Sequence, residues 1–247
     1  MFKQKIASLL VAVTIFTPIA ASAHEHGEAA VARAFIKDIQ QVESSYVAVH
    51  GATFFQELSR GQHPRATVVA CSDSRVHTNM LDTRPEGDLF MIRDIGNQIS
   101  TAKGSVEYGI NHLGSSLLLI LGHSRCGAIV AASSDYSALE DAIKKELDTI
   151  KISKGGANID GVQTNVNNQV AAAMAEYAEA VKEGHLLIVG AVYDFADDMK
   201  QGAGKINIIN VNGKTESKQL KLQLEPQDIA NEMNHITHND AAPAVHH

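Results

Sequence analysis

Two short segments carry side chains that could bind a metal ion: Cys71-Ser72-Asp73-Ser74-Arg75 and His123-Ser124-Arg125-Cys126-Gly127. Each follows an apolar run that is typical of a buried strand, and in an open parallel sheet ligands converge at the carboxyl ends of the strands. Two thiolates and one imidazole form a borderline-soft donor set that suits Zn²⁺. Three protein ligands leave a fourth position open, which is the arrangement of a catalytic zinc site.

The two cysteines also allow a purely structural interpretation. Cys71 and Cys126 are the only cysteines of the 247 residues, so a disulfide between them or a pair of inert buried thiols is the alternative. Each cysteine follows a buried strand, and one of them lies in a His-x-x-Cys segment, so we favour the metal site. Asp73 is close enough to Cys71 to compete for the open position. Gly122 and Gly127 flank the His-x-x-Cys segment and predict a tight turn from strand to helix.

Alternating strands and helices would position these side chains. Short apolar runs rich in β-formers predict strands buried on both faces, at residues 66–70, 89–92, 116–121 and 185–192. Helical patterns lie at 105–113, 138–150 and 162–182. This alternation predicts an α/β fold, a mostly parallel β-sheet flanked by helices. We expect a further strand at 206–211, at the edge of the sheet, and a last helix at 225–236.

Apolar residues recur at helical spacing from Glu28 to Arg60. They predict one or two amphipathic helices ahead of the core, which need a surface to lie against. We expect residues 24–247 to form a single domain that ends in a disordered C-terminal tail. Histidines near both ends could bind stray metal, but solvated tails are the simpler interpretation: His24, His26, His246 and His247.

The first 23 residues have the pattern of a secretory signal peptide. Lys3 and Lys5 precede a mainly apolar run that ends in Ala21-Ser22-Ala23, an A-x-A cleavage site. A membrane anchor needs about 20 apolar residues, and this run is shorter. We therefore expect cleavage after Ala23 and export, most commonly to a bacterial periplasm, with no membrane partner afterwards. The net charge of −7 and the lack of a long basic run argue against a nucleic-acid partner.

Three blocks of the sequence together resemble the β-class carbonic anhydrases: residues 71–76 (CSDSRV), 87–93 (GDLFMIR) and 122–127 (GHSRCG), in the order and spacing of that family. The resemblance runs from about Ala34 to about Val211. It implies a carbonate dehydratase that converts CO₂ and water reversibly into bicarbonate and a proton, with zinc-bound hydroxide as the nucleophile. The substrate is thus a small molecule.

The resemblance also implies roles for individual residues. Zinc is expected on Cys71, His123 and Cys126. Asp73 and Arg75 are expected to form a catalytic dyad, in which a bidentate pair holds the carboxylate off the metal. When that pair breaks, Asp73 could become the fourth ligand of an inactive state.

The sequence further resembles the plant-type branch of the family, which implies a substrate pocket. Its expected members are a glutamine that hydrogen-bonds to substrate, apolar and aromatic wall residues, and a glycine beside a metal ligand: Gln62, Phe90, Ile95, Tyr108 and Gly127. One departure is Asp94, at a position where the family usually has asparagine.

Two other functions fit the same motifs. One is a catalytically silent homologue that binds bicarbonate or metal, and the other is a hydrolase of carbonyl sulfide or carbon disulfide. Asp73 and Arg75 argue against the silent homologue, because a zinc site alone would not need them. Family members pair through N-terminal helices, so the resemblance implies a homodimer or a dimer-based tetramer that uses the stretch from Val31 to Leu58.

Overall fold

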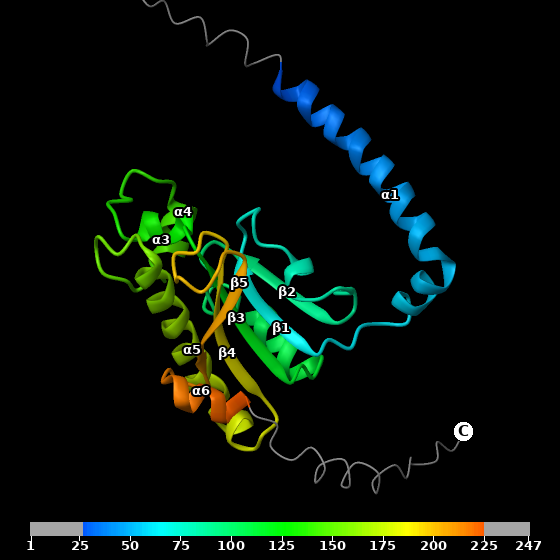
Figure 1. The fold of residues 1–247 in the computed structure, drawn as a ribbon. Helices are drawn as coiled ribbons and strands as arrows, with labels where there is room; N and C mark the ends of the chain where they lie inside the picture. Colours follow the sequence, from blue (N-terminus) through cyan, green and yellow to red (C-terminus); the bar gives the residue numbers. More distant parts are fainter. Residues whose placement is uncertain (1–26, 225–247) are drawn as a thin grey trace, which may run out of the picture. The chain divides into compact units, whose positions relative to one another are not determined.

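The computed structural model describes residues 27–224, and the chain divides after Arg60 into two compact units. The described part of the first unit is helix α1 (Glu28–Leu58), interrupted at Gly51, whose φ of 73° and ψ of 174° are not helical. Two helical segments therefore meet at a kink, which confirms the prediction of one or two helices (Figure 1). No residue of Glu28–Leu58 is buried.

The second unit is built on a five-stranded sheet with the order β2-β1-β3-β4-β5 (Figure 1). Four strands run parallel: β1 (Ala66–Cys71), β2 (Leu89–Asp94), β3 (Leu117–His123) and β4 (Leu187–Asp194). The edge strand β5 (Lys205–Val211) is antiparallel to β4. The predicted α/β fold with a mostly parallel sheet is confirmed, and so is the edge strand.

Strands β1 and β3 extend further than their apolar runs. Cys71 is the last residue of β1 and His123 is the last residue of β3. The backbone pairing continues one step beyond, because the Ser72 amide donates to the Asp94 carbonyl at 2.7 Å and the Ser124 amide donates to the Tyr193 carbonyl at 3.0 Å. Hydrogen bonds of the sheet therefore fix the backbones of Cys71 and His123.

The helices match the predicted ranges only in part. Helix α5 (Ile159–Lys182) was predicted almost in full, whereas α4 (Asp141–Leu147) is shorter than its predicted range. The expected helix at 105–113 is α2 (Lys103–Glu107) continued by the π-helix η2 (Tyr108–His112). The helix expected at 225–236 lies outside the described residues. Three short helices were not predicted: η1 (Thr78–Met80), α3 (Gly127–Ala132) and α6 (Ser217–Leu224).

The core lies mainly between the sheet and α5. Side chains from alternate positions of β3 and β4 pack against α5 in one apolar cluster, and the neighbouring positions belong to a second cluster. Gly122 sits where α5 comes close, because a Cβ there would lie 2.6 Å from Cγ2 of Val166. This close approach brings α5 against the carboxyl end of β3.

Within residues 27–224, no helix is both long enough and apolar enough to span a bilayer. The signal peptide and the terminal histidines lie outside the described residues, so their roles stay predictions. The assignment of residues 24–247 to a single domain also stays a prediction.

Candidate metal centre

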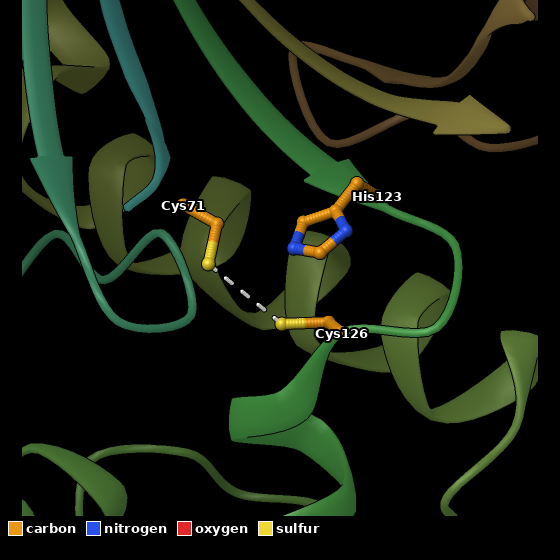
Figure 2. A group of neighbouring side chains, drawn as sticks. All are labelled: Cys71, His123 and Cys126. Carbon is orange, nitrogen blue, oxygen red and sulfur yellow. Dashed lines mark hydrogen bonds between the residues drawn. The ribbon is translucent and has the colours of Figure 1, made fainter. Parts of the chain in front are cut away.

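Three potential ligand atoms meet at the carboxyl ends of β1 and β3 (Figure 2). The sulfurs of Cys71 and Cys126 and a ring nitrogen of His123 all lie within 4.8 Å of one another, and all three residues are buried. The two sulfurs are 3.9 Å apart, and both cysteines are free. Two thiolates on a tetrahedral zinc, each about 2.3 Å from the metal, lie about 3.8 Å apart. The geometry therefore fits a metal site and not a bridge between the cysteines.

The imidazole of His123 is oriented for metal binding. Its Nδ1 lies 3.0 Å from the carbonyl oxygen of Ser124. Because a carbonyl only accepts, Nδ1 carries the proton and Nε2 presents a lone pair. This Nε2 is buried and has no hydrogen-bond partner among the described residues. A buried acceptor without a partner is costly, and a metal ion would satisfy it.

The turn after β3 does not depend on a positive φ at either of its two glycines. Arg125 is the left-handed residue, with φ of 55°, and neither Gly122 nor Gly127 has a positive φ. Gly122 instead allows the contact with α5. A Cβ on Gly127 would meet nothing within 4 Å among the described residues, because that residue faces a cavity. The tight turn is present, but the predicted reason for it was wrong.

Asp73 and Arg75 form a bidentate pair beside the three ligands. Oδ1 of Asp73 accepts from the backbone N and from Nε of Arg75, both at 2.9 Å, and Oδ2 accepts from Nη2 at 2.7 Å. The guanidinium holds the pKa of the Asp73 carboxyl well below its usual range. Oδ2 lies 3.9 Å from Nε2 of His123. A carboxylate is thus held next to the site by a charged partner.

Phe195, which was not predicted from the sequence, supports this pair. The Arg75 guanidinium lies over the Phe195 ring at 4.7 Å, and the His123 ring stacks against the same phenyl ring at 5.9 Å between centroids. Phe195 directly follows β4, so it also comes from the carboxyl end of a strand. Its loop is fixed by buried Asp194, which accepts from three backbone amides, those of residues 196, 198 and 199.

Arg93 fixes the backbone on which Cys71 and Asp73 stand. Its Nε and Nη2 donate to the Cys71 carbonyl at 3.0 and 2.9 Å, and Nη2 also donates to the Asp73 carbonyl at 2.6 Å. The neighbouring Asp94 accepts from the Gln98 amide at 2.8 Å and from the Thr101 hydroxyl at 2.5 Å. Burial raises the pKa of the Asp94 carboxyl to about 6.

The two thiols are electrostatically unequal without a metal. A hydrogen bond with Cys126 lowers the pKa of Cys71 to about 4, and the same contact, together with burial, raises the pKa of Cys126. One sulfur is thus a thiolate at neutral pH while the other keeps the proton between them. Such a thiolate is a ready metal ligand.

A cavity of about 420 Å³ opens beside the site. It has mainly apolar walls, and its lining includes Cys71, Asp73, Ile95, Gly127, Ala128 and Leu147. Ile95 and Gly127, two of the expected pocket residues, line this cavity. A larger depression of about 640 Å³, around Tyr136 and Lys151, contains none of the three ligands.

Within one chain, the structure does not bring the other three expected pocket residues to this cavity. Phe90 is paired with Thr67, four residues before Cys71 along β1, and so lies about 13 Å from it along the sheet. The Phe90 ring packs against that of half-exposed Tyr108, with centroids 5.9 Å apart. Gln62 is exposed ahead of β1. Phe90 and Tyr108 thus pack together near the opposite end of the strands.

The chain is similar to proteins of one known family. Residues 66–203, more than half of the chain, match the family model described as "Carbonic anhydrase". "Carbonic anhydrase 2" of Mycobacterium tuberculosis is 32% identical over 154 residues, which are 57% of this chain and 74% of the relative. "Carbonic anhydrase" of Synechocystis is 39% identical over 101 residues, 38% of this chain and 36% of the relative.

Solved structures resemble the fold as well. A tetrameric β-carbonic anhydrase from Sordaria macrospora has a TM-score of 0.59 at 26% identity, covering 72% of this chain and 97% of its own. A Coccomyxa β-carbonic anhydrase in complex with acetazolamide has a TM-score of 0.59 at 21% identity, with coverages of 84% and 97%, and supports the fold alone.

The fold and the Cys-His-Cys site define a metal-dependent α/β enzyme. The chain belongs to the carbonic anhydrase family, in its β-class. It is accordingly a carbonic anhydrase lyase, and the family supports hydration of CO₂ as its reaction. The resemblance seen in the three sequence blocks is confirmed.

Proposed function

We propose that this enzyme hydrates CO₂ reversibly with zinc held by Cys71, His123 and Cys126. The observation that carries the proposal is the buried cluster of two sulfurs and an unpartnered Nε2, with a charge-paired carboxylate beside it. When bound, zinc lowers the pKa of a water ligand to about 7 and so supplies hydroxide at neutral pH.

The chain's own residues supply orientation and binding. Arg75 keeps Asp73 ionised, and this carboxylate can accept a hydrogen bond from the group that occupies the open ligand position. The pair engages both carboxylate oxygens of Asp73, so its integrity keeps Asp73 from taking that open position itself. CO₂ offers few groups to bind, and the apolar wall formed by Ile95, Ala128 and Leu147 suits it.

Stopped-flow CO₂ hydration on the purified full chain tests the proposal. We expect fast hydration with one zinc per chain, loss of activity after chelation, and recovery when zinc is returned. Zinc-loaded protein that binds bicarbonate without turnover would indicate the silent homologue. A much higher rate with carbonyl sulfide or carbon disulfide than with CO₂ would indicate the related hydrolase.

We also propose a homodimer or a dimer-based tetramer. Helix α1 leaves large apolar side chains exposed, among them Val31, Phe35 and Ile39, and the Sordaria relative is described as tetrameric. Since Gln62, Phe90 and Tyr108 lie away from the cavity of their own chain, they can contact substrate only in the cavity of a neighbouring copy. Light scattering should give the mass of two or four chains, and the mass of one chain would contradict the proposal.

Export to a periplasm, with cleavage after Ala23, is proposed from the sequence pattern alone. Expression of the full chain in a Gram-negative host should give active protein in the periplasmic fraction with His24 as its first residue. An active mature form that retains Met1 would contradict it.

A further inference from the structure

We infer that a buried cluster of amides positions a backbone N–H against the sulfur of Cys71 and so tunes this metal ligand. The amide cluster consists of Gln98, Asn165 and Gln169. The inference rests on the proposed metal site, because a tuned ligand requires a metal to bind. The three amides act through Gly96, so they are positioning residues and do not touch substrate.

The contact with the ligand is made by Gly96, whose amide N lies 3.5 Å from Sγ of Cys71. An N–H that donates to a thiolate withdraws negative charge from the sulfur. A sulfur with less charge donates less strongly to a bound metal, so this hydrogen bond would alter the electronic properties of the site. The position of the Gly96 amide is therefore functionally significant.

Gly96 is held in place by two side-chain donors. Its carbonyl accepts from Nδ2 of Asn165 at 2.9 Å and from Nε2 of Gln98. Its φ is 84°, and a Cβ there would lie 2.8 Å from Cδ1 of Ile150. The positive φ favours glycine, and a Cβ would also crowd the side chain of Ile150. Small changes in the two donors should move this residue relative to Cys71.

The amide cluster is almost fully connected. Gln98 donates to Oδ1 of Asn165 at 3.0 Å and accepts from Nε2 of Gln169 at 2.9 Å and from the Thr149 hydroxyl at 3.1 Å. Oε1 of Gln169 accepts from the Ile99 amide at 2.9 Å. Because each oxygen faces donors and each nitrogen faces acceptors, the orientation of every amide is set by its neighbours.

The location of the cluster links helix α5 to the metal centre. Asn165 and Gln169 are four residues apart, on one face of α5, and Gln98 belongs to the loop that follows β2. The exposed fractions of Gln98, Asn165 and Gln169 are 0%, 1% and 6%. Buried polar networks rigidify a site when they are satisfied, and this one ends on the residue that contacts Cys71.

Asn165→Ala is the test variant, and Asn168→Ala is its matched control. Asn168 lies on the same helix and also donates its amide to a loop carbonyl, that of Lys151 at 2.7 Å, but it is outside the amide cluster. In the cobalt-substituted full chain, loss of the hydrogen bond should leave the sulfur richer in charge. We expect the thiolate-to-cobalt absorption band to move to lower energy in Asn165→Ala and to stay in place in Asn168→Ala.

Transfer of zinc to a competing chelator is the second readout. It should be slower from Asn165→Ala than from the wild type, because a sulfur richer in charge binds zinc more strongly, and it should be unchanged in Asn168→Ala. A folded Asn165→Ala with the wild-type band and transfer rate would overturn the inference.

A measurement without any substitution covers the case in which Asn165→Ala does not fold. In wild-type protein loaded with ¹¹³Cd, the Gly96 amide proton should show scalar coupling to the metal through the N–H···S contact. Cadmium-loaded protein that lacks this coupling overturns the inference and leaves the metal site standing. Wild-type protein that binds neither cobalt nor cadmium overturns the proposed metal site and the inference with it.

Discussion

The turns after β3 and after β1 meet at one metal centre but serve it differently. The β3 turn contributes two ligands within four residues, His123 and Cys126, and both are almost fully buried. The β1 turn contributes one ligand, and its Asp73 and Arg75 side chains remain 17% and 49% exposed. The buried turn is thus suited to hold the metal, whereas the more open turn faces the cavity and is suited to act on what binds there.

The largest effect should follow from damage to the buried turn. Cys126→Ser replaces a thiolate with a hydroxyl, a far poorer zinc ligand, so we expect zinc to fall from one per chain to a small fraction of that. Metal analysis after gel filtration measures it. Ser72→Ala, which changes an exposed non-ligand side chain of the other turn, is the control and should keep its zinc. Full zinc in Cys126→Ser would refute the ligand assignment.

Damage to the open turn should separate activity from metal binding. Asp73→Asn keeps the shape but loses the charge that pairs with Arg75, so CO₂ hydration should fall by about a hundredfold or more while zinc is retained. Stopped-flow rates and metal content are measured on the same sample.

A second carboxylate offers the control for this substitution. Asp88 accepts hydrogen bonds from Nε and Nη2 of exposed Arg65 in a pair of the same kind, and Asp88→Asn should leave the rate unchanged. Wild-type turnover in zinc-loaded Asp73→Asn would contradict the assignment of metal binding to the β3 turn and of catalysis to the β1 turn.

The parts of the site that could be predicted share one property: they are close in sequence to a strand end. Cys71 and Asp73, and likewise His123 and Cys126, are two or three residues apart, so local geometry brings them together once the strands are parallel. Ile95 follows β2 in the same way. Phe195 also follows a strand, but a single aromatic residue has no spacing pattern to mark it.

Features that depend on tertiary packing could not be predicted so well. The 24-residue helix α5 was found because its periodicity extends over several turns, whereas α3, with six residues, is stabilised by its surroundings more than by its sequence. The placement of Phe90 depends on strand register, and a motif in the sequence does not state a register. The amide cluster joins residues about 70 positions apart, so local spacing gives no sign of it.

Phe195 contacts both turns, and a smaller effect is expected there. Phe195→Leu removes the ring under Arg75 and beside His123. A cation–π contact is worth about 0.5–2 kcal/mol, so hydration should fall roughly two- to thirtyfold with zinc retained. Phe195→Tyr keeps the ring and should keep the wild-type rate. Loss of zinc from Phe195→Leu would show instead that the ring mainly supports His123, which assigns it to the buried turn.

The smallest effect is on the free energy of unfolding, and it arises from Asp94 at the end of β2. Asp94 ends β2 opposite Cys71, and burial raises its pKa to about 6, whereas an unfolded aspartate titrates near 3.9. Between these values the folded protein binds more protons than the unfolded chain, so the free energy of unfolding falls as pH rises from about 4 to about 6. Above that window a charged, partly buried carboxylate remains and lowers stability.

Asp94→Asn should remove this penalty. The amide can still accept from the Gln98 amide and can donate to the Thr101 hydroxyl, so the contacts of Asp94 are preserved in kind. We expect the variant to be more stable than the wild type by about 1–2 kcal/mol at pH 7–8, and equally stable at pH 4, where the carboxyl is largely protonated. Urea titrations of both proteins, at one protein concentration and at several pH values from 4 to 8, measure the difference in the free energy of unfolding.

Asp88→Asn supplies the opposite sign in the same experiment. Arg65 lowers the pKa of Asp88 to about 2, so this carboxylate stabilises the fold above the pKa of an unfolded aspartate, and that stability is lost as pH falls toward 2. Its asparagine variant should therefore be slightly less stable than the wild type at neutral pH, by a small amount because the pair is exposed. If Asp94→Asn were instead equally stabilising at every pH, or destabilising at pH 8, the charge at the end of β2 would not be the cause. Asp94 would then act mainly through its hydrogen bonds to Gln98 and Thr101, and burial of its charge would not lower the stability of the fold.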